Sequence, residues 1–179
     1  MEKVGKLFGI LGSIIEVLSR GAGGVVAFCI ATAVVLTTYG VVMRYAVNQP
    51  PLFVVEYDGY LMLGVTFMGM AYALREGAHI KLTILTEHLS KRVQNLLEAI
   101  TLSVGLVFTG FFIKWVYTLW LFSWEQGVKS VTAMETFLWI PQTAMLIGFP
   151  LLALQLIVVI VRRVKAFRSA NQTPGMMKE

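Results

Sequence analysis

Few charged side chains in this sequence could do chemistry together, and three of them fall close to one another. Arg44 ends one apolar stretch, and Glu56 and Asp58 open the next one after the short turn NQPP. An ion pair between the guanidinium and a carboxylate would hold the two stretches together, and partial burial would raise its contribution above the roughly 0–1 kcal/mol of an exposed pair. Glu56 is the better partner for Arg44 if Asp58 points outward. The alternative is that the three charges only mark where two helices leave a membrane, and the sequence leaves both interpretations open.

Lys114 is the only full charge deep inside an apolar run. An ionisable residue inside a membrane is a functional hypothesis by default. This lysine lies about two to three helical turns from the nearer end of its run, so its long side chain can reach the interface. We therefore expect Lys114 to reach the surface or to pair with another group, rather than to bind a substrate or an ion.

The remaining residue types give no enzyme signature. His79 and His88 both fall in one polar stretch between apolar runs, so a haem held by two histidines between helices is hard to build. We interpret His79 as a helix-end residue rather than a ligand. The lone Cys29 allows neither an intrachain disulfide nor a cysteine metal cluster. Since no Ser/His/Asp arrangement, phosphate-binding glycine loop or metal-ligand spacing is present, we expect no enzyme activity and no cofactor in this chain.

The composition is that of an integral membrane protein. Of 179 residues, 57% are hydrophobic and only 14% are charged, and the mean hydropathy is +0.74, which is too apolar for a soluble domain. The net charge of +5 could suggest nucleic acid, but the basic residues lie between apolar runs, where they encode membrane topology. We expect membrane lipids as surroundings and no nucleic-acid partner.

The apolar runs predict an all-α integral membrane protein, a single membrane domain with four transmembrane helices. Each run is long enough to cross a hydrocarbon core of roughly 30 Å, and the four runs are residues 24–43, 52–74, 96–122 and 140–161. Two amphipathic helices are expected to lie on the membrane surface, one N-terminal at 1–20 and one in the middle loop at 79–92. Residues 169–179 are expected to form a flexible tail. The alternative for residues 1–20 is a cap that packs on its own protein.

The basic residues predict the orientation of the chain. All of them except Arg44, Lys114 and Lys129 lie in the N-terminal segment, in the stretch that begins at Arg75, or in the C-terminal tail. Loops rich in Lys and Arg remain in the cytoplasm. Both termini and the middle loop are therefore expected to be cytoplasmic.

Small residues indicate where another helix could pack. Gly64, Gly69 and Ala73 share the second span, and Gly69 and Ala73 form a small-xxx-small pair that allows close helix approach. Ala27 and Ala31 form a similar pair in the first span. We expect these faces to contact a partner helix.

A series of motifs extends over nearly the whole chain. It comprises VVMRY at Val41–Tyr45, Asn48, Pro51–Phe53, Glu56, Tyr60-Leu61, GMAYALREGAHIKL at Gly69–Leu82, and Trp139, Pro141 and Gly148. Their order and spacing resemble the small membrane subunit of tripartite ATP-independent periplasmic (TRAP) transporters, the DctQ-type family. Glu56 and His79 match positions of the family pattern. Val55 stands where the family has the first member of an acidic pair, so no role is carried over for a second carboxylate.

The resemblance implies a four-helix scaffold in the inner membrane of a bacterium. Such a subunit binds a much larger membrane subunit, which carries the substrate and sodium sites, and a periplasmic solute-binding protein delivers an organic acid to the pair. Sodium coupling is then expected in the large partner, and this chain braces it. The candidate structural or interface residues are Arg44, Glu56, Asp58, Gly64, Gly69, Ala73, Arg75, His79 and Lys114.

Two other function classes remain open on the residues alone. A small four-helix membrane enzyme of the glutathione-using type would need polar residues from several helices to converge on a cofactor. A membrane anchor of a redox complex would need histidines that face each other inside the bilayer. Thiol-transferase activity of the isolated chain would indicate the first class, and bound haem would indicate the second.

Overall fold

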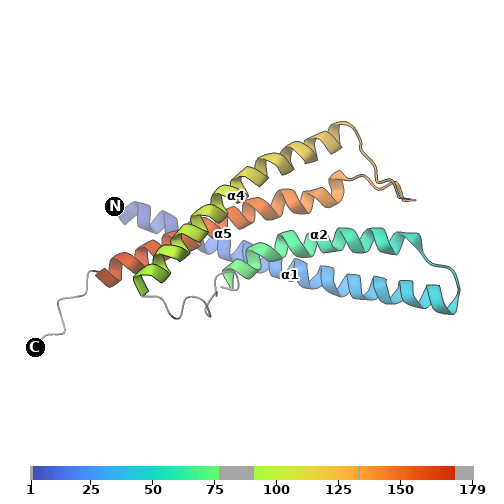
Figure 1. The fold of residues 1–179 in the computed structure, drawn as a ribbon, viewed down its shortest axis with the longest axis horizontal. Helices are drawn as coiled ribbons and strands as arrows, with labels where there is room; N and C mark the ends of the chain where they lie inside the picture. Colours follow the sequence, from blue (N-terminus) through green and yellow to red (C-terminus); the bar gives the residue numbers. More distant parts are fainter. Residues whose placement is uncertain (1, 77–90, 133, 172–179) are drawn as a thin grey trace, which may run out of the picture.

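The computed structural model describes residues 2–76, 91–132 and 134–171 and consists of four long helices (Figure 1). They are α1 (Glu2–Ala46), α2 (Leu52–Arg75), α4 (Lys91–Glu125) and α5 (Trp139–Asn171). Each contains a stretch long and apolar enough to cross a membrane, namely Gly12–Ala46, Leu52–Arg75, Ile100–Glu125 and Trp139–Arg162. The predicted all-α fold with four apolar helices is confirmed, and the described residues contain no β-strand.

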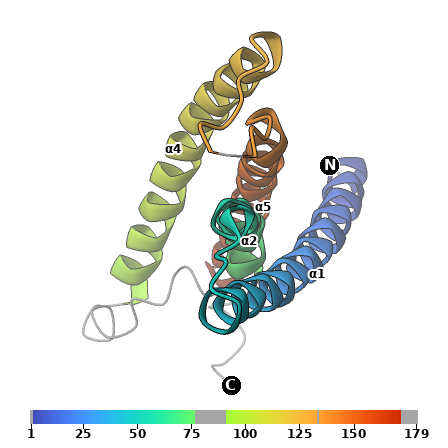
Figure 2. The same ribbon diagram turned by 90° about the vertical axis from the view of Figure 1, so that its right-hand side faces the viewer.

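The four helices are arranged with α2 and α5 in the centre. Contacts join α1 to α2, α2 to α5, α5 to α4 and, less extensively, α1 to α5. Viewed from one end, α4 and α1 lie on opposite sides of the α2–α5 pair, and α1 curves along its length (Figure 2). The start of α1 and the end of α5 lie at one end of the molecule, here called the terminal end. Turns 47–51 and 126–138 lie at the other, the loop end (Figure 1).

Gly148 lets α5 approach α2 closely. A Cβ atom at this position would lie 2.5 Å from the backbone oxygen of Phe67 and 2.7 Å from its carbonyl carbon, so a larger residue fits only if a helix moves. Next to this contact, the ring centroid of Phe149 lies 5.1 Å from that of Phe67 on α2 and 5.6 Å from that of Phe112 on α4. Toward the terminal end the core continues with four buried leucines of α2, α4 and α5: Leu74, Leu102, Leu152 and Leu156.

Two small residues of the second span pack on α1 of the same chain. A Cβ atom at Gly64 would lie 3.4 Å from the sulfur of Cys29, and one at Gly69 would lie 3.7 Å from a methyl carbon of Val26. Ala73 is partly buried. The close helix approach that we expected at Gly64 and Gly69 therefore exists within this chain, between α2 and α1.

The turn between α1 and α2 is short. Asn48 has a φ of 61°, a left-handed conformation that Asn adopts more readily than most residues. The N–H of Gln49 donates to the backbone oxygen of Met43 at 3.2 Å, which satisfies one carbonyl group at the end of α1. Because the turn is this short, α1 and α2 are antiparallel neighbours.

α1 is longer than the spans predicted from sequence. It runs without a break through residues 21–23, which we expected to separate an interfacial helix at 1–20 from a span at 24–43. Glycine costs a helix only about 1 kcal/mol per residue, a cost that packing against neighbours can offset. Residues 16 and 19 of this segment contact α5, as in the alternative of a segment that packs on its own protein. Where the membrane surface crosses α1 stays a prediction.

α5 also continues beyond the span predicted at 140–161. It reaches Asn171, so residues 169–171 of the predicted tail are helical. This stretch contains neither proline nor glycine, so no residue there breaks the helix. Residues 77–90, which include His79 and most of the predicted interfacial helix, lie outside the described residues, as do residues 172–179.

Replacing Gly148 by alanine should destabilise the helix packing, because the new methyl group would overlap the backbone of Phe67. Overpacking of this kind costs about 1–3 kcal/mol. The matched control is Gly110→Ala on α4, where nothing lies within 4 Å of the added Cβ atom and alanine favours the helix. We expect a lower midpoint of thermal unfolding in detergent for Gly148→Ala only. Equal midpoints for the two variants would contradict the close approach.

Candidate functional site

The described residues 126–132 and 134–138, here called the turn 126–138, fold back on themselves at the loop end. The N–H of Ser130 donates to the backbone oxygen of Thr136 at 2.8 Å, and the N–H of Leu138 donates to that of Val128 at 3.0 Å. These bonds pair the two sides of the turn, between the end of α4 and the start of α5. The turn therefore has a defined shape that can present side chains to the helices beneath it.

An exposed ion pair crosses this turn. Lys129 Nζ lies 2.9 Å from Glu135 Oε2. The hydrogen bond from Lys129, together with its charge, holds the pKa of the Glu135 carboxyl below its ordinary value of 4.5. The contribution of the pair to stability is therefore present at neutral pH and is lost as the pH falls through this lowered pKa. Because both side chains are largely exposed, that contribution is small.

Glu56 connects the turn to α2. The residue is buried, with 8% of its surface exposed. The hydroxyl of Tyr60, one helical turn further along α2, donates to Glu56 Oε1 at 2.6 Å, and the hydroxyl of Thr132 in the turn donates to Glu56 Oε2. A buried carboxylate needs such donors because burial of an unpaired charge is costly. Glu56 thus positions the turn over the start of α2.

The hypothetical ion pair between Arg44 and Glu56 is not formed. Arg44 is exposed and takes part in no ion pair within the described part of the chain. It is Asp58 that faces α1, since the hydroxyl of Thr37 donates to Asp58 Oδ2 at 2.7 Å. The helical period explains this orientation: Val54, which contacts α1, precedes Asp58 by four residues and shares its side of α2. Glu56 lies midway between these two residues in the sequence, and its side chain faces the turn 126–138 instead of α1.

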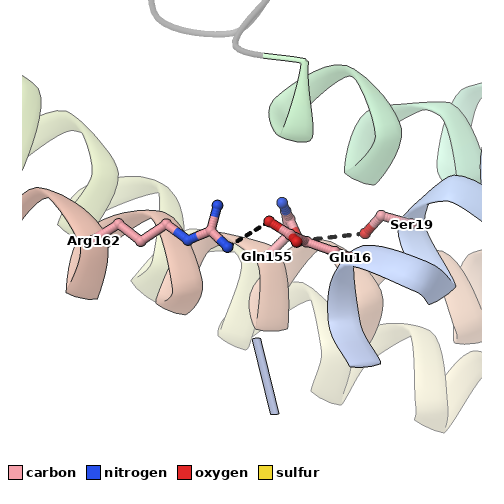
Figure 3. Close-up of polar contacts among 4 residues, drawn as sticks. All are labelled: Glu16, Ser19, Gln155 and Arg162. Atoms are coloured by element: carbon pink, nitrogen blue, oxygen red, sulfur yellow. Dashed lines mark hydrogen bonds and ion pairs between the residues drawn. The ribbon is translucent and has the colours of Figure 1, made fainter. Parts of the chain in front are cut away.

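A second polar group, the terminal-end cluster, joins α1 to α5 (Figure 3). The hydroxyl of Ser19 donates to Gln155 Oε1 at 3.3 Å, and the carboxylate of Glu16 pairs with the guanidinium of Arg162. Ser19 is 0% exposed and Gln155 2%. Polar side chains that meet between apolar helices satisfy each other where water does not reach. These four residues lie where α1 contacts α5.

A third polar contact joins α4 to α5 near the loop end. The indole N–H of Trp120 donates to the hydroxyl of Thr143 at 3.1 Å, and that hydroxyl donates to the backbone oxygen of Trp139 at 2.8 Å. The ring centroid of Trp124 lies 5.5 Å from that of Trp120 and 4.7 Å from that of Trp139. Tryptophan rings favour the level of the lipid headgroups, so this group indicates where the membrane interface crosses α4 and α5.

The other candidate residues lie apart from these contacts. Lys114 is exposed on α4 and has no charged partner among the described residues. Arg75 pairs with the adjacent Glu76 at 3.3 Å at the end of α2. No group of three or more His, Cys, Asp and Glu side chains in the described ranges could hold a metal ion. The polar side chains of Glu56, Asp58 and the terminal-end cluster connect segments of the protein to one another.

Sequence reasoning missed the contacts of Ser19, Gln155 and Thr132. Gln155 stands inside the run LLALQLIVVIV, where an amide needs a partner, so it could have been singled out as a helix contact. Ser19 is one of several small polar residues of its segment and gives no such signal. Thr132 lies in a loop, where no periodic pattern indicates which way a side chain points.

Replacing Glu56 by leucine should loosen the turn 126–138, because Thr132 loses its acceptor. Hydrogen bonds to charged groups contribute about 1.5–3 kcal/mol, so opening of the turn should increase by about tenfold or more. The measurement is the rate of tryptic cleavage after Lys129, an exposed residue of this turn. Arg44→Gln is the control and should leave the rate unchanged. Equal acceleration by both substitutions would favour the Arg44–Glu56 ion pair instead.

Comparison with known proteins identifies the family to which this chain is similar. The family model described as "Tripartite ATP-independent periplasmic transporters, DctQ component" matches residues 33–166, which is most of the chain. The ectoine TRAP transporter small permease protein TeaB of Halomonas elongata is 30% identical over 81 residues, which cover 45% of this chain and 42% of that protein. The chain thus matches less than half the length of this curated relative. Since the family model covers all four apolar helices at least in part, the chain belongs to the DctQ component family of TRAP transporters.

Proposed function

We propose that this chain is the scaffold subunit of a sodium-coupled TRAP transporter. It braces a large membrane subunit that imports an organic acid delivered by a periplasmic solute-binding protein. The family assignment favours a transport component over the membrane enzyme and the redox anchor considered above. The observation that carries the bracing role is the open arrangement of the helices, with α1 and α4 on opposite sides of the α2–α5 pair (Figure 2). Both of these outer helices carry exposed large apolar side chains.

Large apolar side chains on α1 and α4 point away from the rest of the chain. On α1, Phe28 is 71% exposed and Val35 is 67% exposed; on α4, Val107 is 76% exposed and Trp115 is 61% exposed. In a bilayer such faces contact lipid or another membrane protein. Helices placed side by side, rather than closed into a bundle, make the immobile part of the transporter wider in the membrane plane. A wide immobile part resists tilting in the membrane when a neighbouring transport domain moves.

Of the two faces, that of α1 is better suited to a partner helix. Ala27 and Ala31, one helical turn apart, are both exposed, and small residues let helices approach closely where lipid provides no hydrophobic drive. The α4 face carries Phe111, Trp115 and Lys114, all exposed, and such side chains suit lipid and its interface. We therefore place the large subunit against α1 and lipid against α4.

The loop end is the candidate surface for the periplasmic protein. With the orientation inferred from the basic residues, the turn 126–138 faces the periplasm. Glu56 gives that turn a defined position, and Val131 at its tip is fully exposed. A preformed surface loses little conformational entropy on binding, which favours docking of a soluble protein there.

A bulky side chain at Ala31 should weaken assembly with the large subunit. Ala31→Trp would keep a partner helix from approaching α1, and we expect co-purification of the large subunit to fall by about tenfold or more. Gly110→Trp on α4 is the matched control, because its position is exposed with nothing within 4 Å of the added Cβ atom. Loss of the large subunit with Gly110→Trp alone would place the interface on α4.

Removing the charge of Lys114 should leave transport unchanged. A bound ion or substrate in a low-dielectric interior needs convergent polar partners, and Lys114 is exposed with no charged partner in the described part of the chain. In uptake measured with the reconstituted complex, Lys114→Met should change neither the substrate concentration for half-maximal uptake nor the sodium dependence. A shifted sodium dependence in an intact complex would assign part of the transport site to this chain and contradict the scaffold role.

A further inference from the structure

A small cavity lies between α1 and α2 at the loop end. Its volume is about 240 Å³, and Arg44, Pro51 and Asp58 are among the residues that line it. The apolar stretch of α1 ends here at Ala46, and that of α2 begins here at Leu52. Helix ends of this kind mark the boundary of the hydrocarbon core. In a bilayer the mouth of the cavity, at Arg44 and Pro51, therefore lies at the depth of the lipid headgroups, and its inner part, at Thr37 and Asp58, lies within the spans.

The cavity contains one charged group of each sign, and neither forms an ion pair with a described residue. Arg44 is exposed and forms no ion pair with a described residue. Asp58 Oδ2 accepts a hydrogen bond from Thr37 at 2.7 Å, whereas Asp58 Oδ1 is buried and accepts none from the described residues. A buried carboxylate oxygen without a donor is costly. A donor from outside the chain would remove this cost.

The rest of the lining is largely apolar. Gly40 and Val41 of α1, together with Val54 and Val55 of α2, form most of the remaining wall. Tyr45, which also lines the cavity, is 81% exposed, as expected for an aromatic residue at the headgroup level. The surroundings therefore suit a ligand with an anion, a cationic hydrogen-bond donor and a hydrocarbon portion.

We propose that this cavity binds the headgroup of a phosphatidylethanolamine, with the phosphate on Arg44 and the ammonium on Asp58. A guanidinium presents paired N–H donors that match two phosphate oxygens. The primary ammonium brings three N–H donors, and rotation about the Cβ–Cγ bond of Asp58, a soft torsion, turns a carboxylate oxygen toward it. The assignment uses only the α1–α2 hairpin and does not depend on the transport role.

The same chemistry predicts which lipids the cavity rejects. Phosphatidylcholine carries the same two charges, but its trimethylammonium group has no N–H to donate to Asp58. Phosphatidylglycerol offers a phosphate to Arg44 but has no cation. The carboxylate of Asp58 therefore selects the ethanolamine headgroup, while Arg44 attracts any phospholipid.

The test is native mass spectrometry of the full chain in detergent, with these three lipids carrying identical acyl chains. We expect the wild-type chain to retain phosphatidylethanolamine about tenfold better than phosphatidylcholine, which is the contribution of one charge-assisted hydrogen bond. Equal retention of the two lipids by the wild-type chain would overturn the proposal, and would mean that water or Arg44 itself satisfies Asp58.

Three variants locate the site. Asp58→Asn should lower retention of phosphatidylethanolamine to the level of phosphatidylcholine, and Arg44→Gln should lower retention of both. Lys129→Gln removes a basic residue at the same end but outside the cavity, so it should keep the wild-type preference. An unchanged preference in Asp58→Asn, or its loss in Lys129→Gln, would show that the cavity is not the site. Arg44 is exposed, so Arg44→Gln should not disturb the fold. This variant therefore still tests the site if Asp58→Asn disturbs the α1–α2 hairpin.

A soluble headgroup distinguishes a lipid from a free phosphate ester. Glycerophosphoethanolamine has the same phosphate and ammonium but lacks acyl chains that could follow the apolar wall. At equal concentration it should not displace the bound lipid. Displacement would identify a soluble phosphate ester as the ligand and would overturn the lipid assignment.

Discussion

The close approach of α5 to α2 at Gly148 is the contact on which the rest of the structure depends. Lipid tails are as apolar as leucine, so helices in a membrane associate through tight packing and interhelical hydrogen bonds. At Gly148 the two backbones come within contact distance. From there Phe149 reaches the rings of Phe67 and Phe112, and further along α5 Gln155 binds α1. α5 is thus the helix that contacts all three of the others.

Polar contacts stabilise the two ends of the molecule separately, whereas its middle relies on apolar packing. At the loop end, Glu56 gathers hydroxyl donors from its own helix and from the turn above it. At the terminal end, the contacts of Glu16 and Ser19 hold α1 against α5. Since each polar group satisfies a partner from another segment, neither end exposes an unpaired charge to the hydrocarbon at these positions. The two ends are therefore stabilised by separate sets of polar contacts.

The four helices could be predicted because each contains a long apolar run. A run that is long enough to cross the hydrocarbon core of a membrane is expected to form a transmembrane helix. The rotation of each helix about its axis could not be predicted in the same way. Asp58 rather than Glu56 faces α1 because Val54 packs there, which is a matter of tertiary contact. The bond from Thr132 to Glu56 depends on how the turn 126–138 folds, and no periodicity encodes that fold. The family pattern included Glu56 but did not indicate its partners.

The central place of α5 has a consequence for the order in which the protein is made. Of the four spans described, α5 is synthesised last, whereas α1 and α2 are adjacent in the chain and can pair as soon as both are inserted. α4 packs mainly on α5, so it stays in the membrane without its main partner until α5 is inserted. Synthesis proceeds from the N-terminus at about 5–20 residues per second, which leaves α4 exposed for seconds. The third span of the nascent chain therefore lacks its main packing partner until α5 has been inserted.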